Sequence, residues 1–272
     1  VVDAFSRIVR LGEGLAQSGA ISTAAMDRAL SALSVCAEKL VRRNVYMARS
    51  VATEACRRAA NGAEFVDRVY RETGIKLDII SAQEEARLAV LGCHVLLEEG
   101  DSPALVFDIG GGSTELTFFR DGQALASRSF ALGTVRLLSE ADSAAVWSDL
   151  QTWLEAECAK LDGPVALVGA GGNINKAHKI SGRPVEEPLS KQYLDRFSKQ
   201  LEAMTPDERV LQLGLNLDRA DVIVPALRIY RRVLRWTHAT WVYVPKIGVS
   251  DGIVRELYHR KHRAQWEQRL ES

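Results

Sequence analysis

Two acidic residues flank a run of glycines in the stretch DIGGGSTE, which extends from Asp108 to Glu115. Apolar residues lead into this stretch and out of it, as they do in paired β-strands. Glycine weakens a strand unless another group must approach the backbone closely. Successive backbone N–H groups in such a turn form a concave anion site. We therefore expect a phosphate to lie against the backbone of Gly110, Gly111 and Gly112.

The side chains around these glycines suggest how the phosphate is held. Ser113 and Thr114 offer hydroxyl donors, whereas the carboxylates of Asp108 and Glu115 would repel a phosphate. These acids are useful if a divalent cation lies between them and the phosphate, since Mg²⁺ prefers carboxylates together with substrate phosphates. The sequence thus predicts a site for Mg²⁺ or another divalent cation. The alternative is a tight hairpin with incidental acids.

A second glycine loop, VGAGGN at Val168 to Asn173, follows an expected strand and precedes an expected helix. Such turns are common in α/β folds, so this loop alone is a weak signal. Together with the first loop it predicts a cleft for a polyphosphorylated ligand, with Gly171 and Gly172 binding phosphate. No GxxxxGK[ST] pattern occurs, so the loop is not a P-loop.

Strands and helices are expected to alternate along the chain, which indicates an α/β fold with mainly parallel sheets and antiparallel hairpins at the edges. A strand is expected at Val1–Val9, Ser22 is expected to begin a helix, and Asn61-Gly62 to interrupt one. Asp121-Gly122 predicts a hairpin turn. A change of composition near Gly100–Pro103 divides the chain into predicted lobes at residues 1–101 and 102–272.

Composition restricts the class of partner. The 272 residues contain 35 Lys and Arg against 35 Asp and Glu, which argues against a protein held on nucleic acid by bulk charge. No apolar run approaches the ~20 residues that span a bilayer, so no membrane association is expected. The four cysteines lack zinc-ligand spacing and are expected to be reduced thiols, as in a cytoplasmic protein.

Several motifs occur in an order that resembles one known family. DIGGGSTE resembles the phosphate loop of the actin-like ATPase and sugar kinase superfamily. Further stretches narrow the resemblance to the exopolyphosphatase/guanosine pentaphosphatase family: VRLGEGL, ATEACRRAANG, IISAQEEARL, LGTVRL, VGAGGN, LDRADVIVPA and GVSDGIV. The resemblance implies two ribonuclease H-like (actin-like) lobes with mixed sheets and an active site in the cleft between them.

The resemblance also implies roles for individual residues. Glu85, the second acid of QEEAR, matches the general base, and Arg57 matches an arginine that contacts phosphate. Arg10 matches a further phosphate contact, while Asp108 and Glu115 match the metal-associated carboxylates. Without the surrounding motif, Glu85 would be interpreted as a solvated acid at a helix N-terminus.

The sequence departs from the family pattern at its start. The family carries an earlier loop of the type Asp-x-Gly-Ser-Asn-Ser, and we expect this loop among the residues encoded upstream of Val1. The alternative is a protein that has lost this half of its phosphate clamp. The segment Arg228–Trp236, with four arginines, is expected to be an amphipathic helix; the alternative is a basic wall for a polyanion.

The resulting expectation is hydrolysis of the terminal phosphoanhydride of inorganic polyphosphate, with guanosine pentaphosphate as the alternative substrate. A kinase or ATPase of the same superfamily, and a non-enzymatic binder of phosphorylated nucleotides, are further alternatives. The sequence does not fix the oligomeric state, and a homodimer is left open.

Overall fold

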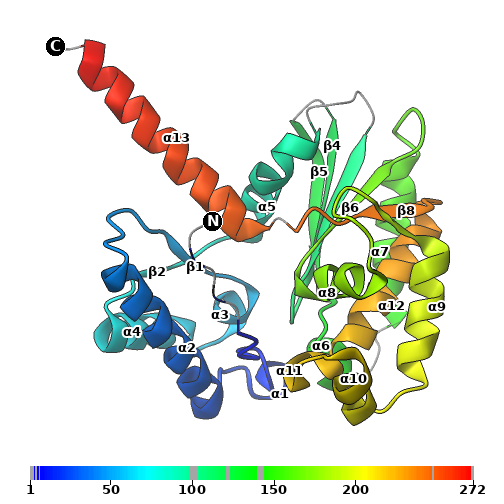
Figure 1. Cartoon of the computed structure of the whole chain (residues 1–272), viewed down its shortest axis with the longest axis horizontal. Coiled ribbons are helices and arrows are strands. Elements are labelled where there is room, and N and C mark those ends of the chain that lie inside the picture. Colours follow the sequence, from blue (N-terminus) through cyan, green and yellow to red (C-terminus); the bar gives the residue numbers. More distant parts are fainter. Residues whose placement is uncertain are drawn as a thin grey trace. The chain divides into compact units, whose positions relative to one another are not determined.

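The computed structural model describes Asp3, Phe5 and residues 7–97, 103–120, 123–139, 144–246 and 248–270. Contacts divide the chain into two compact units (Figure 1). Unit 1 combines Val1–Gly92 with Val249–Ser272, and unit 2 is Cys93–Gly248. The predicted boundary at 101 and 102 lies outside the described residues. The predicted second lobe extended to Ser272, whereas the segment from Val249 onward groups with unit 1.

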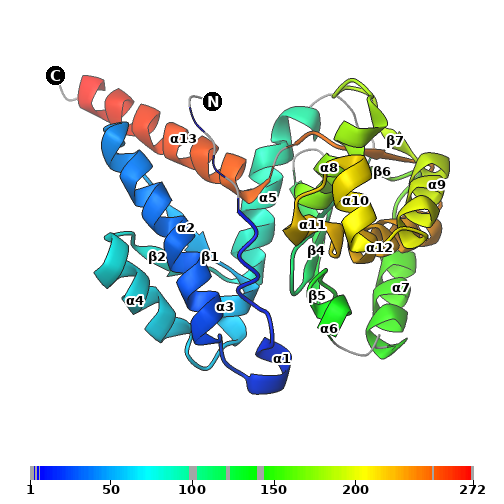
Figure 2. The same cartoon turned by 60° about the horizontal axis from the view of Figure 1, so that its bottom comes forward.

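Unit 1 contains a parallel pair of short strands, β1 (Ser50–Ala52) and β2 (Leu77–Ile79). Helices α2 and α4 pack against each other beside this pair (Figure 2). The helices of the unit are α1 (Leu15–Ser18), α2 (Thr23–Arg42), α3 (Glu54–Arg58), α4 (Gly62–Thr73), the part of α5 (Ala82–Leu97) up to Gly92, and α13 (Val249–Leu270). Helix α13 joins the unit through a small core in which Ile253 packs with Ile80 and Leu88. This packing is the physical reason for the difference from the predicted division.

Unit 2 contains a mixed sheet in the order β5-β4-β3-β6-β8-β7. Its strands are β3 (Ala104–Ile109), β4 (Thr114–Arg120), β5 (Gln123–Phe130), β6 (Ala166–Ala170), β7 (Leu189–Ser190) and β8 (Trp241–Tyr243). Its helices are α6 (Arg136–Ser139), α7 (Ala144–Cys158), α8 (Gly172–Ser181), α9 (Lys191–Glu202), α10 (Pro206–Leu213), α11 (Leu217–Ala220) and α12 (Ile223–Trp236). The central strands β3 and β4 are almost wholly buried, and they carry the acid-flanked glycine turn.

Local signals correctly placed several element ends. The Ser22 side chain accepts the N–H of Ala25 and caps α2, because an N-cap oxygen satisfies an unpaired donor of the first turn. Gly62 begins α4 after the predicted break, where a Cβ would lie 2.1 Å from the carbonyl oxygen of Cys56. Strands β4 and β5 pair antiparallel as the predicted hairpin requires, although its turn at Asp121-Gly122 lies outside the described residues.

The expected strand at Val1–Val9 is wrong for the residues that the structure describes there. Asp3, Phe5 and residues 7–9 belong to no strand. A strand needs a hydrogen-bonded neighbour, and β1 pairs with β2 alone in the described part of unit 1. The segment instead lies on α2, where Asp3 pairs with Lys39 at 2.8 Å and Val9 accepts a hydrogen bond from Arg28.

The arginine-rich segment folds as the amphipathic helix α12. Its apolar side is fully buried, and Arg231 on the polar side pairs with Asp195 of α9 at 2.7 Å. Among the described helices, none combines the length and the apolar composition that crossing a membrane would need.

Candidate active site

Asp108 and Glu115 stand directly opposite each other on the antiparallel strands β3 and β4. Opposed residues of such a pair present their side chains on the same face of the sheet. The glycines between them form the turn, which is closed by a 2.9 Å hydrogen bond from the Gly110 N–H to the Ser113 carbonyl. The two strands thus bring together the two acids that the sequence predicted as metal ligands.

The segment LGTVRL fixes the backbone of this turn. The carbonyl of Gly110 accepts the N–H of Thr134, and the carbonyl of Gly111 accepts the N–H groups of Val135 and Arg136. Gly133 allows this approach, because a Cβ there would lie 2.3 Å from the Gly111 carbonyl oxygen. Within the described part of the chain, the N–H groups of Gly111 and Gly112 donate to no other residue. These two amides therefore have the property that an anion site requires.

The hydroxyl groups next to the glycines bond within the chain. Ser113 Oγ and Ser129 Oγ donate to Glu115 Oε1 at 2.6 and 3.1 Å. Thr114 Oγ1 donates to the carbonyl of Leu132, and the Thr114 side chain is fully buried. The structure thus gives both hydroxyls a part in fixing the turn, and their contact with phosphate stays a prediction.

The second glycine loop lies beside the first, because β6 is the parallel neighbour of β3 and Asp108 is in register with Ala170. Gly171 has a φ of 102°, and a Cβ there would lie 2.9 Å from Asp108 Oδ1. Only glycine fits this combination of backbone and neighbour. The structure therefore brings Gly171 and Asp108 together, as the proposed pair of phosphate loops requires.

Two residues near this loop were not singled out from the sequence. The guanidinium of Arg219 lies on Gly172 and donates to its carbonyl oxygen. Arg219 belongs to LDRADVIVPA, so the motif itself was a signal. Tyr230 donates to the Ala170 carbonyl at 2.8 Å, and burial, assisted by the charge of Asp108, raises the pKa of its hydroxyl.

Unit 1 pairs the predicted base with the predicted phosphate-binding arginine. Arg57 of α3 donates to Glu85 Oε2 and to the Ile80 carbonyl, each at 2.8 Å. The Glu85 side chain is only 13% exposed, and burial raises the pKa of its carboxyl. Hydrogen bonds from Arg57 and Thr53 oppose that rise. Glu85 is thus a largely buried carboxylate that is paired with Arg57.

The neighbouring acid has a different environment. Glu84 accepts hydrogen bonds from Arg87 and Arg49, and these lower the pKa of its carboxyl to about 2. A carboxylate with so low a pKa is a poor proton acceptor near neutral pH. The structure therefore separates two acids that are adjacent in QEEAR. The predicted residue Arg10 lies in the loop before α1 with a φ of 48°, and its contact with phosphate stays a prediction.

The donor set fits a divalent cation that is shared with substrate. Among the described residues, no group of three or more His, Cys, Asp or Glu side chains is arranged to hold a metal. Asp108 and Glu115 together supply two carboxylates. Mg²⁺ is commonly bound through one or two carboxylates plus substrate phosphates, so this pair is sufficient.

The Ppx/GppA phosphatase family matches residues 1–261 of the chain. The chain belongs to this family. Family membership confirms the resemblance drawn from the motifs and the expected class of enzyme, a phosphoanhydride hydrolase.

Two curated members of the family illustrate its range. The chain is 28% identical over 271 residues to a putative exopolyphosphatase of Haemophilus influenzae, covering 94% of this chain and 81% of the relative. It is 30% identical over 266 residues to a guanosine-5'-triphosphate,3'-diphosphate pyrophosphatase of Vibrio cholerae. That match covers 92% of this chain and 53% of the relative, so the chain spans about half of the longer protein.

Solved structures of Ppx/GppA proteins confirm the α/β fold class. An exopolyphosphatase from Cytophaga hutchinsonii superposes with a TM-score of 0.81 at 25% identity, over 92% of this chain and 86% of that one. The type II variant of the Aquifex aeolicus Ppx/GppA phosphatase gives a TM-score of 0.65 at 25% identity, over 92% of this chain and 88% of that one. The predicted cleft between the lobes stays a prediction.

Proposed function

We propose that this protein is an exopolyphosphatase that hydrolyses the terminal phosphoanhydride of inorganic polyphosphate and releases orthophosphate. The observation that carries the proposal is the acid-flanked turn, in which the Gly111 and Gly112 amides have no partner within the described chain. The similarity to exopolyphosphatases, by sequence and by structure, supports the choice of substrate.

The reaction needs a nucleophile and neutralisation of charge. Glu85 accepts a proton from a water molecule whose oxygen attacks the terminal phosphorus, while the bond from that phosphorus to the bridging oxygen breaks. Burial favours this role, because a raised pKa makes a carboxylate a better proton acceptor.

The charge of the phosphate chain is offset by donors and cations. Arg57 supplies a planar guanidinium, and the glycine turn supplies backbone amides that require no reorganisation. A divalent cation, when bound by Asp108 and Glu115, would neutralise charge on the phosphate oxygens. Transfer to water depends on this placement and neutralisation more than on covalent help.

Guanosine pentaphosphate is the second candidate substrate, and the similarity to the Vibrio cholerae pyrophosphatase supports this candidate. Both substrates end in a phosphoanhydride, and the same groups would act on either. A cytoplasmic location and a homodimer remain predictions.

The test is release of orthophosphate by the purified chain with Mg²⁺, measured separately on polyphosphate and on guanosine pentaphosphate. We expect the higher kcat/KM on polyphosphate. A higher value on guanosine pentaphosphate would replace the first candidate by the second. Phosphorylation of a small acceptor by ATP, without release from either substrate, would identify a kinase. Binding without turnover of any substrate would identify a non-enzymatic binder.

A further inference from the structure

Helix α13 packs closely on the helix that carries Glu85, although the two helices are far apart in sequence. A Cβ at Gly252 would lie 1.9 Å from the carbonyl oxygen of Leu88, so the backbones touch at this crossing. Ile253 is buried there, and Arg255 donates to the carbonyl of Leu91 at 3.2 Å. Helix α13 therefore has one fixed position along α5.

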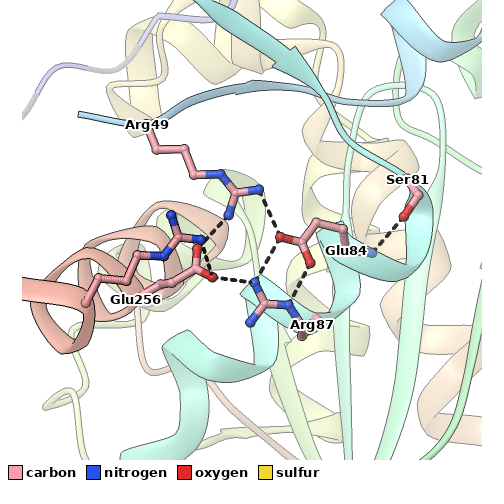
Figure 3. Close-up of polar contacts among 6 residues, drawn as sticks. Arg49, Ser81, Glu84, Arg87 and Glu256 are labelled. Carbon is pink, nitrogen blue, oxygen red and sulfur yellow. Dashed lines mark hydrogen bonds and ion pairs between the residues drawn. The ribbon is translucent and has the colours of Figure 1, made fainter. Parts of the chain in front are cut away.

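An ion-pair network joins the same two helices at the first turn of α5, which carries Glu84 and Glu85 (Figure 3). Arg87 donates to both carboxylate oxygens of Glu84 at 2.6 and 2.9 Å and to Glu256 of α13 at 3.0 Å. Arg49 donates to Glu84 at 2.9 Å and to Glu256 at 2.6 Å. Two arginines and two glutamates thus form a closed cycle, in which each charge contacts both opposite charges.

This cycle determines the position of the first turn of α5. Ser81 Oγ accepts the N–H of Glu84 at 3.1 Å, so both the backbone and the side chain of Glu84 are held (Figure 3). Glu85 follows directly in the chain. The segment from Arg49 to Arg57 contacts both acids, since Arg49 donates to Glu84 and Arg57 donates to Glu85. A shift of Glu84 would therefore move Glu85 relative to Arg57.

One side of the cycle is withdrawn from solvent. The side chains of Arg49 and Glu256 are 17% and 16% exposed, whereas those of Arg87 and Glu84 are 48% and 26% exposed. Apart from any contribution to stability, the cycle imposes geometry, because an arginine fork accepts few arrangements of two carboxylates.

We propose that Arg49, Glu84, Arg87 and Glu256 form a positioning network through which α13 sets the orientation of the Glu85 carboxylate. The proposal rests on the proposed function of Glu85 as the base. None of the four residues acts on substrate in this proposal. Their effect passes through the first turn of α5, so their loss would affect the chemical step more than substrate binding.

The experiment compares Arg87→Gln and Glu256→Gln in the full chain with the matched control Arg68→Gln. Arg68 also holds two carboxylates in unit 1, Asp27 at 2.8 Å and Glu72 at 2.7 Å, but it does not contact α5. We expect each network variant to lower kcat between about tenfold and a hundredfold with KM unchanged, because small misplacements of a reacting group are costly. Arg68→Gln should lower the melting temperature about as much as the network variants do, but it should leave kcat unchanged. Equal kcat in all three variants, measured below their melting temperatures, would overturn the proposal.

A second measurement separates this proposal from the proposed function. If the wild-type chain hydrolyses neither polyphosphate nor guanosine pentaphosphate, the proposed function is rejected. The positioning network can then still be tested by the carbon NMR titration of the Glu85 carboxyl. The charged and polar side chains that act on the Glu85 carboxyl are Arg57, Thr53 and Glu54. Arg87→Gln and Glu256→Gln should both raise its midpoint, because a displaced Glu85 loses part of the hydrogen bond and charge of Arg57 that lower its pKa. Midpoints equal to that of the wild type in both variants would reject the network.

Discussion

The guanidinium of Arg57 and the carboxylate of Glu85 lie 2.8 Å apart, although they are separated by 28 residues of sequence. The pair joins α3 to α5 and places a cation on a largely buried acid. Burial alone would favour the protonated form of the acid, and the arginine opposes that preference. The carboxylate can therefore be ionised while it is poorly hydrated, and both properties suit a proton acceptor.

Glu85→Gln should lower kcat between about a hundredfold and ten-thousandfold, because the amide cannot accept a proton from water. The affinity for polyphosphate should remain within about threefold, since the predicted phosphate contacts involve other residues. Orthophosphate release and equilibrium binding are the measurements. Glu64→Gln, an exposed acid of α4, is the control and should retain full activity. Full activity of Glu85→Gln would remove the base from the mechanism.

Arg57→Gln should move the acid limb of the kcat/KM profile to higher pH. Burial already raises the pKa of Glu85, and the hydrogen bond and charge of Arg57 oppose that rise. Without Arg57 the pKa rises further, so the base is protonated over a wider range. The loss of activity should therefore be larger at pH 6 than at pH 9, beyond any uniform loss from weaker phosphate binding. An acid limb at the wild-type position would contradict this account.

Glu84 should stabilise the fold except in acid. Its pKa is lowered from 4.5 to about 2, chiefly by the hydrogen bond from Arg87. A lowered pKa contributes stability that is present above the unfolded value and lost as pH falls through the folded value. The difference in unfolding free energy between wild type and Glu84→Gln should thus shrink from pH 4.5 toward pH 2. Urea unfolding at a series of pH values measures it, and a constant difference would show that the charge is not responsible.

Gly252→Ala should destabilise unit 1 by about 1–3 kcal/mol, because the new methyl group meets a backbone carbonyl that cannot move aside. At an open helical position the same change would stabilise by about 0.5–1 kcal/mol. Gly12→Ala is the matched control in the same unit, since its Cβ would make an ordinary 3.7 Å contact with Ala55. Thermal unfolding distinguishes the two variants, and a more stable Gly252→Ala protein would refute the close crossing of α13 and α5.

Glu115→Gln should raise the Mg²⁺ concentration for half-maximal activity by at least about tenfold, since Mg²⁺ binds carboxylates in preference to amides. Ser113 and Ser129 can still donate to the amide oxygen, which should preserve the turn. Asp149→Asn, an exposed acid of α7 in the same unit, is the control. Titration of activity with MgCl₂ measures the effect. An unchanged requirement would exclude Glu115 as a metal ligand.

The local chemistry of the chain determined much of the fold and of the candidate site. Ser22 marks the start of α2 through its own side chain, and the glycines of DIGGGSTE mark the turn between β3 and β4. Such signals act over a few residues, because caps and turns depend on adjacent backbone groups. The order of the motifs was sufficient to indicate the family that the comparisons confirm.

Only the tertiary structure decided which groups meet. It separated Glu84 from Glu85 by giving them different arginine partners, and it placed Glu256 beside Arg87 across 169 residues. It also added Arg219 at the second glycine loop and grouped Val249–Ser272 with unit 1. These contacts depend on the path of the whole chain, and a charged side chain does not encode its distant partner in the sequence around it.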